Sequence, residues 1–171
     1  PMNRLQRLIR RKTLQNDRPD ATMYPGYHGM VWSTGRISTP VPAFIARTLP
    51  DVVNLHWLGN GFVSVDNISR IQRPVVWTLH DMWAMSGGCH YAGDCERFLT
   101  GCGTCPQLGS RDPRDISFQT WANKQRMWGS LNLTVVTPSR WLADLVRASP
   151  LLHNRRIEVI PNGIDMQIYR P

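Results

Sequence analysis

The sequence of 171 residues is long enough for one folded domain with a single hydrophobic core. Hydrophobic residues make up 42% of it and charged residues 19%, a balance that excludes an intrinsically disordered chain. No stretch approaches the roughly 18 consecutive apolar residues that a transmembrane helix needs. The net charge of +8 comes mainly from residues 1–48, which hold eight basic and two acidic side chains.

The basic segment, residues 1–49, is the part whose structure is hardest to predict. Leu5, Leu8 and Ile9 recur at helical spacing beside arginines, as in a helix that lies on a membrane surface, although a solvated basic helix gives the same pattern. Its charge suits an anionic membrane or a nucleic acid. Because the basic start is not followed by the apolar run of a secretion signal, we expect a cytoplasmic protein, with peripheral binding at the inner face of the membrane as an open alternative.

Further along the chain, helices and strands alternate. The strands are predicted at residues 51–55, 74–79, 133–137 and 157–160, and the helices at residues 40–49, 62–71, 117–130 and 140–149. The apolar faces of the first three helices are Phe44, Ile45 and Leu49, then Val65, Ile68 and Ile71, then Phe118, Trp121 and Trp128. Strands that alternate with helices form β-α-β units, so we predict the α/β fold class: a Rossmann-like parallel sheet with flanking helices. The apolar run Val75-Val76-Trp77 indicates strands that are buried on both faces.

Two predicted strands end in histidines. His56-Trp57 follows the strand at 51–55, and His80-Asp81 follows the strand at 74–79. The carboxyl ends of parallel strands meet at one edge of a sheet, where α/β proteins bind ligands. An imidazole there can donate or accept a hydrogen bond, and an adjacent carboxylate can orient a hydroxyl group or take its proton. His80 and Asp81 are therefore the candidate catalytic residues, and a purely structural histidine is the alternative interpretation.

The other two strand ends carry candidates with a simple structural explanation. Ser139 follows the third strand, where its simplest role is to cap the next helix. Asn162-Gly163 follows the fourth strand, where the simplest structure is a turn with positive φ at Gly163. In a parallel sheet these residues would reach the same edge as His80, which makes them candidates for contact with a substrate.

Four sequence strings, in order, carry a family pattern. They are V-V-W-T-L-H-D-M-W-x-x-x-G-G-C-H-Y at 75–91, C-G-T-C-P-Q-L at 102–108, V-T-P-S-R-W-L at 136–142 and V-I-P-N-G-I-D at 159–165. Together they closely resemble the N-terminal half of family 4 glycosyltransferases, which have the GT-B architecture. The resemblance implies two Rossmann-like domains across a cleft, the N-terminal one for the acceptor and the C-terminal one for a nucleotide-sugar donor. It also implies sugar transfer with retention of configuration and without a catalytic metal, so we expect catalysis to require no cofactor.

The resemblance also assigns roles to residues. His80 matches the family's histidine near the transferred sugar, and we expect Asp81 to act beside it in catalysis. The candidate substrate-binding residues are His56, Trp57, Trp83, Ser139, Asn162 and Gly163. The expected partners are a nucleotide-sugar donor and a glycan or lipid-linked acceptor in polysaccharide biosynthesis, with an anionic membrane surface as a further possibility.

The same resemblance predicts how the chain is divided. Residues 50–165 would form the acceptor-side domain, with a cysteine loop at 87–109, after the basic segment at 1–49. Residues 166–171 would begin a linker to a donor-binding domain that this sequence does not contain. The positive groups that stabilise the leaving nucleotide would lie in that domain, so we expect the full-length protein to be a glycosyltransferase and this chain alone to be inactive.

All four cysteines lie in the cysteine loop, at the spacing Cys89-x5-Cys95-x6-Cys102-x2-Cys105. A C-x2-C pair is a good half-site for tetrahedral zinc, and His90 could replace one cysteine. A structural zinc ion, free thiols and disulfides all remain open interpretations.

Two alternatives to the enzyme remain. One is a basic zinc-binding nucleic-acid module, which would explain the cysteines and the charge together. We expect no nucleic-acid partner, because the basic residues lie far in sequence from the cysteines. The other is a non-catalytic membrane-surface domain that has the same fold.

Overall fold

The computed structural model describes residues 19–170, and the prediction of an interfacial helix at Leu5, Leu8 and Ile9 lies outside them. The helices are α2 (Pro19–Thr22), α3 (Val41–Thr48), α4 (Val65–Ser69), α5 (Ile116–Trp128) and α6 (Arg140–Ala148), and the strands are β1 (Val53–Leu55), β2 (Val75–Thr78), β3 (Leu133–Thr137) and β4 (Arg156–Val159). Among the described residues, no helix has the length and apolar character to cross a membrane.

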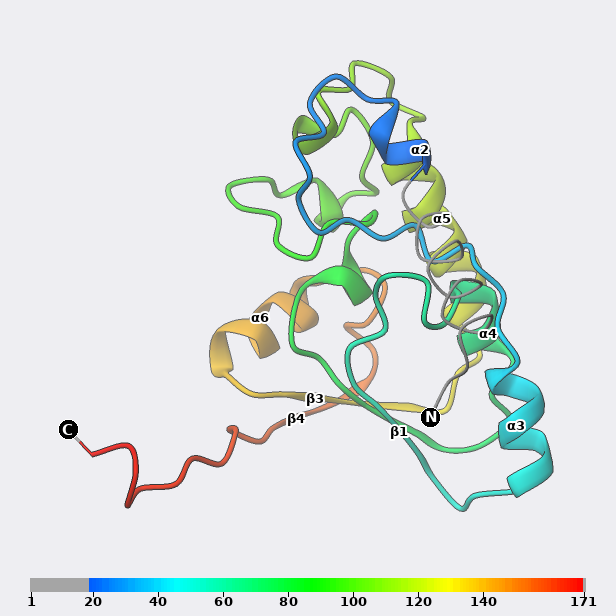
Figure 1. Cartoon of the computed structure of the whole chain (residues 1–171), viewed down its shortest axis with the longest axis vertical. Coiled ribbons are helices and arrows are strands. Elements are labelled where there is room, and N and C mark those ends of the chain that lie inside the picture. The colour runs from blue at the N-terminus through cyan, green and yellow to red at the C-terminus, as the bar shows by residue number, and fades with distance from the viewer. Residues whose placement is uncertain (1–18, 171) are drawn as a thin grey trace, which may run out of the picture.

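The four strands form one parallel sheet in the order β1-β2-β3-β4 (Figure 1). Val53 pairs with Val75, Val75 with Leu133, and Val135 with Ile157, so the strands run in step across the sheet. This confirms the predicted Rossmann-like α/β fold. Because all four strands point the same way, their carboxyl ends share one edge, as the sequence predicted.

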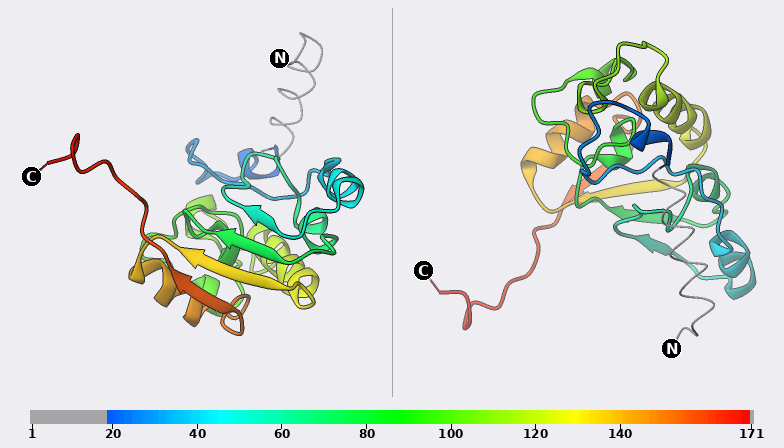
Figure 2. Two further views of the ribbon diagram at one scale, coloured as in Figure 1. Left: turned by 90° about the horizontal axis from the view of Figure 1, so that it is seen from below. Right: turned by 45° about the horizontal axis from the view of Figure 1, so that its top comes forward.

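The helices that connect successive strands lie on one side of this sheet. Figure 1 shows α4, α5 and α6 above the strands, and the view from below in Figure 2 shows the strands in front of them. Right-handed crossovers between strands in sequential order place every connecting helix on the same face. Val75 and Trp77 are buried beneath these helices, whereas Val76 and Thr78, on the other face, are half-buried. The predicted burial on both faces is therefore incomplete in β2, whereas in β3 the adjacent Val135 and Val136, on opposite faces, are both buried.

Two helix predictions need correction. In α3 only Ile45 is buried, while Phe44 and Leu49 are 57% and 61% exposed, so the predicted shared face does not form. Helix α4 is shorter than the predicted 62–71, because a turn with positive φ at Asn60 precedes it and the Ser64 hydroxyl caps it by accepting a hydrogen bond from the backbone of Asn67. The predicted buried face of Val65, Ile68 and Ile71 is confirmed.

A tryptophan cluster joins the sheet to the helices and to the loop after β2. Trp77 of β2 packs edge-on against Trp128 of α5, with ring centroids 5.3 Å apart, and Trp83 of the loop lies 6.3 Å from each of them. Lys124 of α5 is fully buried among these rings, and its ammonium donates hydrogen bonds to the carbonyls of Trp83 and Ser86. The loop after β2 is thereby fixed to the core directly beyond the strand end.

The long loop between β2 and α5 contains only three short 3₁₀ helices, Trp83–Met85, Arg97–Leu99 and Pro106–Leu108. Residues 20–36 lie along it, as both Figure 1 and Figure 2 show. Trp32 forms a β-bridge with Cys89, and the backbone of Ser33 donates to the carbonyl of Gly88 at 2.9 Å. A segment of the sequence without clear periodicity thus becomes one wall around the cysteine loop.

Candidate functional site

The candidate site begins with two histidines at the carboxyl ends of adjacent strands. His56 follows β1 and His80 follows β2, and both are exposed. Nδ1 of His56 and Nε2 of His80 are 2.9 Å apart, a hydrogen-bonding distance, and the ring planes differ by 19°. The parallel register of β1 and β2 therefore brings together two imidazoles that the sequence placed 24 positions apart.

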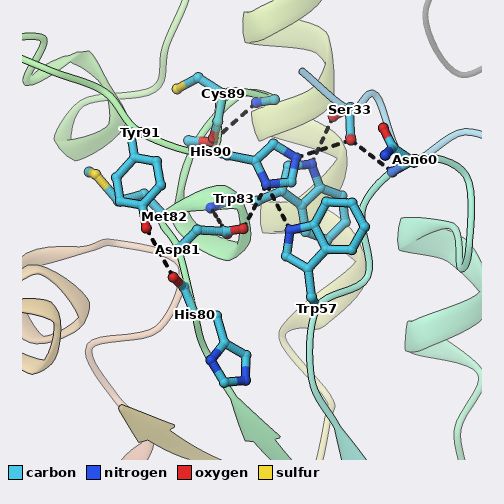
Figure 3. A network of polar contacts seen from close by, with 12 residues as sticks. Ser33, Trp57, Asn60, His80, Asp81, Met82, Trp83, Cys89, His90 and Tyr91 are labelled. Carbon is cyan, nitrogen blue, oxygen red and sulfur yellow. Dashed lines mark hydrogen bonds and ion pairs between the residues drawn. The ribbon is translucent and has the colours of Figure 1, made fainter. Parts of the chain in front are cut away.

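The Asp81 side chain points away from that of His80 and toward His90 (Figure 3). Its Oδ2 lies 2.6 Å from Nδ1 of His90, and its Oδ1 accepts a hydrogen bond from the backbone of Trp83 at 2.8 Å. Burial opposes ionisation of Asp81, but the hydrogen bond and charge of His90, the Trp83 N–H and the Trp57 indole lower its pKa below the ordinary value. Asp81 is therefore ionised near neutral pH, and its two hydrogen bonds fix the loop that follows β2.

His90 connects Asp81 to the segment before α3. The imidazole is 5% exposed, and its Nε2 lies 3.1 Å from Oγ of Ser33, which in turn accepts a hydrogen bond from the backbone of Asn60 at 3.0 Å. With Nδ1–H donating to Asp81, Nε2 accepts from the Ser33 hydroxyl in the neutral imidazole or donates to it in the imidazolium, and the Trp57 indole N–H then has the Asp81 carboxylate rather than Nδ1 as its acceptor. The chain Ser33–His90–Asp81 has the connectivity of a catalytic triad. Ser33 is 0% exposed, however, so the network positions residues and offers no nucleophile to a substrate.

The two tryptophans predicted to bind substrate occupy different environments. Trp57 is 43% exposed, and its Nε1 lies 3.2 Å from Nδ1 of His90 beside the Asp81 carboxylate. Trp83 is 2% exposed, and its Nε1 donates to the carbonyl of Ser33 at 2.7 Å. The structure thus leaves Trp57 accessible to a ligand and places Trp83 inside the core.

A small hollow links these side chains. Its volume is ≈ 10 Å³, and its lining includes His56, Trp57, His80, Asp81 and His90. This space is too small to hold a ligand, so it shows only that these side chains are neighbours. Ser139, Asn162 and Gly163 do not line this hollow.

Ser139 and the Asn162-Gly163 pair lie at the ends of β3 and β4. The Ser139 hydroxyl accepts a hydrogen bond from the backbone of Leu142 at 3.3 Å, which confirms its role as the cap of α6. Asn162 and Gly163 are exposed on an extended segment that leads away from the sheet, shown in red in Figure 1. The predicted turn with positive φ at Gly163 does not form.

A larger, open hollow of ≈ 870 Å³ lies on the cysteine loop. It is bordered by residues between Ala92 and Thr100 and by Pro106 and Gln107. The Gln107 amide donates to the carbonyl of Tyr91 at 2.6 Å, and the Tyr91 hydroxyl donates to the carbonyl of His80 at 3.2 Å. These two hydrogen bonds connect the border of the hollow to the histidine pair.

The four cysteines are free thiols in the structure. Within residues 19–170, no group of three or more histidine, cysteine, aspartate or glutamate side chains could hold a metal ion. The zinc interpretation of Cys89, Cys95, Cys102 and Cys105 stays a prediction.

The residues of the site that come from distant loops were not predicted from the sequence. Ser33 and Asn60 lack a motif of their own, and Ser33 meets His90 across 57 positions. His90 did carry a signal, because it stands in the G-G-C-H-Y string, but we interpreted it as a metal ligand rather than as the partner of Asp81.

Comparison with known proteins gives the family context for this geometry. The sequence profile of Glycosyltransferase Family 4 matches residues 9–168. A protein of Escherichia coli (strain K12) described as "Putative colanic acid biosynthesis glycosyl transferase WcaC" is 32% identical over 137 residues. The aligned region covers 71% of this chain and 33% of that relative, so the chain spans about a third of the relative's length. No solved structure gives a significant match.

Proposed function

The chain belongs to glycosyltransferase family 4, and on this premise we propose that it forms the acceptor-side part of an enzyme that transfers a sugar in polysaccharide biosynthesis. The observation that carries the proposal is the exposed His56–His80 pair at the carboxyl edge of the parallel sheet. This edge is where α/β folds bind ligands. The pair also lies within the matched region.

His80 is the residue that contacts the sugar in this proposal. Its Nε2 is engaged with His56, and among residues 19–170 its Nδ1 has no hydrogen-bond partner. Nδ1 is therefore the nitrogen that can donate to or accept from a sugar hydroxyl. His56 fixes the ring of His80 from behind, and an oriented polar group contributes more to a transition state than a mobile one.

Asp81 has a supporting role in this mechanism. Both of its carboxylate oxygens are engaged, one with His90 and one with the backbone of Trp83. A carboxylate held in this way cannot take a proton from an acceptor hydroxyl without losing its partners. Asp81 instead holds the backbone that follows His80, and it is a positioning residue rather than a catalytic one.

The donor is a nucleotide sugar, bound mainly by the part of the full-length protein that lies outside this chain. Positive or hydrogen-bonding groups there would stabilise the leaving diphosphate, which is commonly a large catalytic contribution. Transfer proceeds with retention of configuration and needs no metal at the reaction centre. The chain alone would then bind an acceptor without turning over.

The acceptor is a glycan or a lipid-linked glycan that enters along the cysteine loop. The open hollow of ≈ 870 Å³ is large enough for a sugar unit, and its border connects to His80 through Gln107 and Tyr91. Asp94, Glu96 and Arg97 line it and provide hydrogen-bonding groups suited to hydroxyls.

The test is an assay of the full-length protein against a panel of nucleotide sugars, with cell-surface glycan and lipid-linked acceptors. We expect transfer from one donor class, and we expect the 171-residue chain alone to give none. Absence of transfer and of donor hydrolysis across the panel would contradict the enzyme. Robust transfer by the isolated chain would contradict only the proposal that the donor is bound mainly by the part of the protein outside this chain.

A further inference from the structure

Trp57 is one of two exposed tryptophans among the seven in the chain, at 43%, with Trp141 at 56%. The other five are at most 6% exposed. An exposed apolar side chain is ordinary on a protein surface and carries no functional meaning by itself. Trp57 differs from such a side chain in two respects, which are its place beside the histidine pair and the contacts that hold its ring.

The position of Trp57 is at the carboxyl edge of the sheet, where α/β folds bind ligands. It follows His56 directly after β1, and it lines the same small hollow as His56 and His80. The exposed indole is therefore a neighbour of the imidazoles that the proposed function assigns to the sugar. Any group that the histidine pair binds has this aromatic ring beside it.

The indole of Trp57 is held in place although it is exposed. Its N–H has the Asp81 carboxylate as acceptor, and Nε1 lies 3.2 Å from Nδ1 of His90 (Figure 3). The rings of Trp57 and His90 also pack together, with their centroids 5.4 Å apart. At Gly59 a Cβ would lie 2.6 Å from Cζ2 of Trp57 and 2.8 Å from Cε1 of His90, so a larger residue there would displace these rings.

The buried polar network behind Trp57 fixes the loop that carries it. His90 bonds to Asp81 on one side, and its Nε2 lies 3.1 Å from Oγ of Ser33 on the other. Ser33 in turn accepts a hydrogen bond from the backbone of Asn60, three residues after Trp57, at 3.0 Å. Buried polar networks of this kind restrict the conformation of what they hold. The result here is an exposed aromatic ring with restricted rotation.

We propose that Trp57 stacks against the C–H face of a pyranose unit of the acceptor glycan. In this inference Asp81, His90 and Gly59 are positioning residues, which act through the indole ring. The inference rests on the proposed function, because it names the part of the acceptor that lies beside His80.

The chemistry of a pyranose fits this pair of groups. A pyranose carries hydroxyl groups around its rim and C–H groups on its faces, and the slightly positive C–H groups suit the negative face of an aromatic ring. His80 bonds to a hydroxyl of the rim, while Trp57 contacts a face of the same unit. Because the indole is already ordered, little conformational entropy is lost when the sugar binds.

The first experiment detects this contact by nuclear magnetic resonance and needs no glycosyltransferase assay. In the isotope-labelled 171-residue chain, the indole N–H signal of Trp57 is the one that Trp57→Phe lacks. The probes are the methyl glycosides of glucose, galactose, mannose and N-acetylglucosamine, titrated into the high-millimolar range, with uridine and guanosine monophosphates as nucleotide probes. We expect at least one glycoside to shift this signal saturably. Shifts with the nucleotides alone, or no shift with any glycoside, would overturn the inference, because a nucleobase also stacks on an aromatic ring.

Variants show whether the ring itself is the contact. Trp57→Ala should weaken glycoside binding about tenfold, the effect of losing one aromatic contact, whereas Trp57→Phe should keep most of the affinity because an aromatic face remains. Phe44→Ala is the matched control, because Phe44 is a 57% exposed aromatic residue of α3 outside the site, and it should leave binding unchanged. Equal affinity in wild type and Trp57→Ala would overturn the inference, and so would a loss in Trp141→Ala instead.

A double-mutant comparison tests the positioning role of Asp81. Asp81→Asn should lower glycoside affinity about fivefold, the effect of one hydrogen bond, in the wild-type background but not in the Trp57→Ala background. It should also move the Trp57 indole N–H signal, because the charged acceptor is lost. Gly59→Ala, which keeps the indole but displaces it, should weaken binding as well. An equal loss of affinity from Asp81→Asn in both backgrounds would show that Asp81 does not act through Trp57.

These outcomes separate the inference from the proposed function. Glycoside binding by the chain needs no donor, so it remains measurable if the full-length protein transfers no sugar. In a full-length enzyme that does transfer, Trp57→Ala should raise KM for the acceptor and leave kcat little changed, because the stacking contact is made equally in the ground state and the transition state. Transfer with an unchanged KM in Trp57→Ala would overturn the inference and leave the proposed function intact.

Discussion

Nδ1 of His56 and Nε2 of His80 lie 2.9 Å apart at the ends of two neighbouring parallel strands. A hydrogen bond between two ring nitrogens requires a proton on one of them and a lone pair on the other, so each imidazole selects the tautomer of its partner. The contact also restricts rotation of both rings. The pair presents one defined ring nitrogen of His80, rather than a freely rotating imidazole, to whatever binds at this edge.

The first prediction concerns His80. His80→Ala in the full-length enzyme should lower kcat/KM by at least about 100-fold, because a positioned imidazole is lost from the reaction centre. The melting temperature should change little, since His80 is exposed. Steady-state kinetics and a thermal melt check both statements, with exposed His153→Ala as the control for losing an imidazole. Unchanged kinetics in His80→Ala would remove this residue from the mechanism.

The second prediction separates His56 from His80. His56→Ala should lower kcat by about tenfold, the cost of one hydrogen bond to a neutral group, because His80 is no longer held in one orientation. His56→Gln should restore much of that loss, since an amide can still bond to Nε2 of His80. Equal losses in the two variants would mean that His56 does something other than orient its neighbour.

This pair also shows how far the sequence could predict the site. Strand ends at His56 and His80 were predicted from short apolar runs, and the rule that parallel strands share an edge placed both histidines at that edge. Their contact was not predicted, because the order of the strands in the sheet was not known from the sequence. The contact between Ser33 and His90 did not follow, because Ser33 lies in a segment without periodicity and meets the loop only through tertiary packing. The sequence therefore predicted the edge where His56 and His80 lie, and it missed both their contact and the buried network of Ser33, His90 and Asp81.

The fold shows the same division. Val65, Ile68 and Ile71 were predicted correctly as a buried face, because helical periodicity is a local property that the sequence displays directly. The exposure of Phe44 and the partial exposure of Val76 were not predicted, because exposure depends on which neighbouring segments cover a surface. Apolar character alone does not determine coverage.

The third prediction concerns the contact between Asp81 and His90. Asp81→Asn should reduce the free energy of unfolding by about 2 kcal/mol, because it replaces a charged hydrogen-bond acceptor that is only 13% exposed with an amide beside the same donors. Urea unfolding measures this difference. Asp144→Asn, at a 72% exposed carboxylate paired with Arg147, should cost no more than about 0.5 kcal/mol. Equal losses of free energy of unfolding in the two variants would show that the contact between Asp81 and His90 stabilises the protein no more than an exposed ion pair does.

The fourth prediction is the pH dependence of that contribution. Burial acts against ionisation of Asp81, but its hydrogen bonds outweigh burial and lower the pKa in the folded state. A carboxyl with a lowered folded pKa stabilises the protein fully above its unfolded pKa, about 4, and the contribution disappears as the pH falls through the folded value. Above roughly pH 5, Asp81 is ionised in both the folded and the unfolded state, so the stability difference between wild type and Asp81→Asn should reach its full value there. On further acidification this difference should shrink. A difference that grows at low pH would reverse the sign and contradict the assignment.

The fifth prediction tests the close approach of Trp32 to the cysteine loop. Gly88 has φ +143°, and a Cβ there would lie 2.5 Å from atoms of the Trp32 ring. Gly88→Ala should therefore cost more than about 2 kcal/mol of stability, through backbone strain together with displacement of the ring. Gly93→Ala is the matched control, because Gly93 also has positive φ, +59°, but its Cβ would meet nothing within 4 Å, so only the backbone cost of about 1 kcal/mol applies. Urea unfolding and the near-ultraviolet tryptophan signal should separate the two variants, since only Gly88→Ala moves Trp32. Equal destabilisation by the two substitutions would mean that the contact between Trp32 and Gly88 does not stabilise the cysteine loop. The packing of the segment before α3 against that loop would then contribute nothing to its stability.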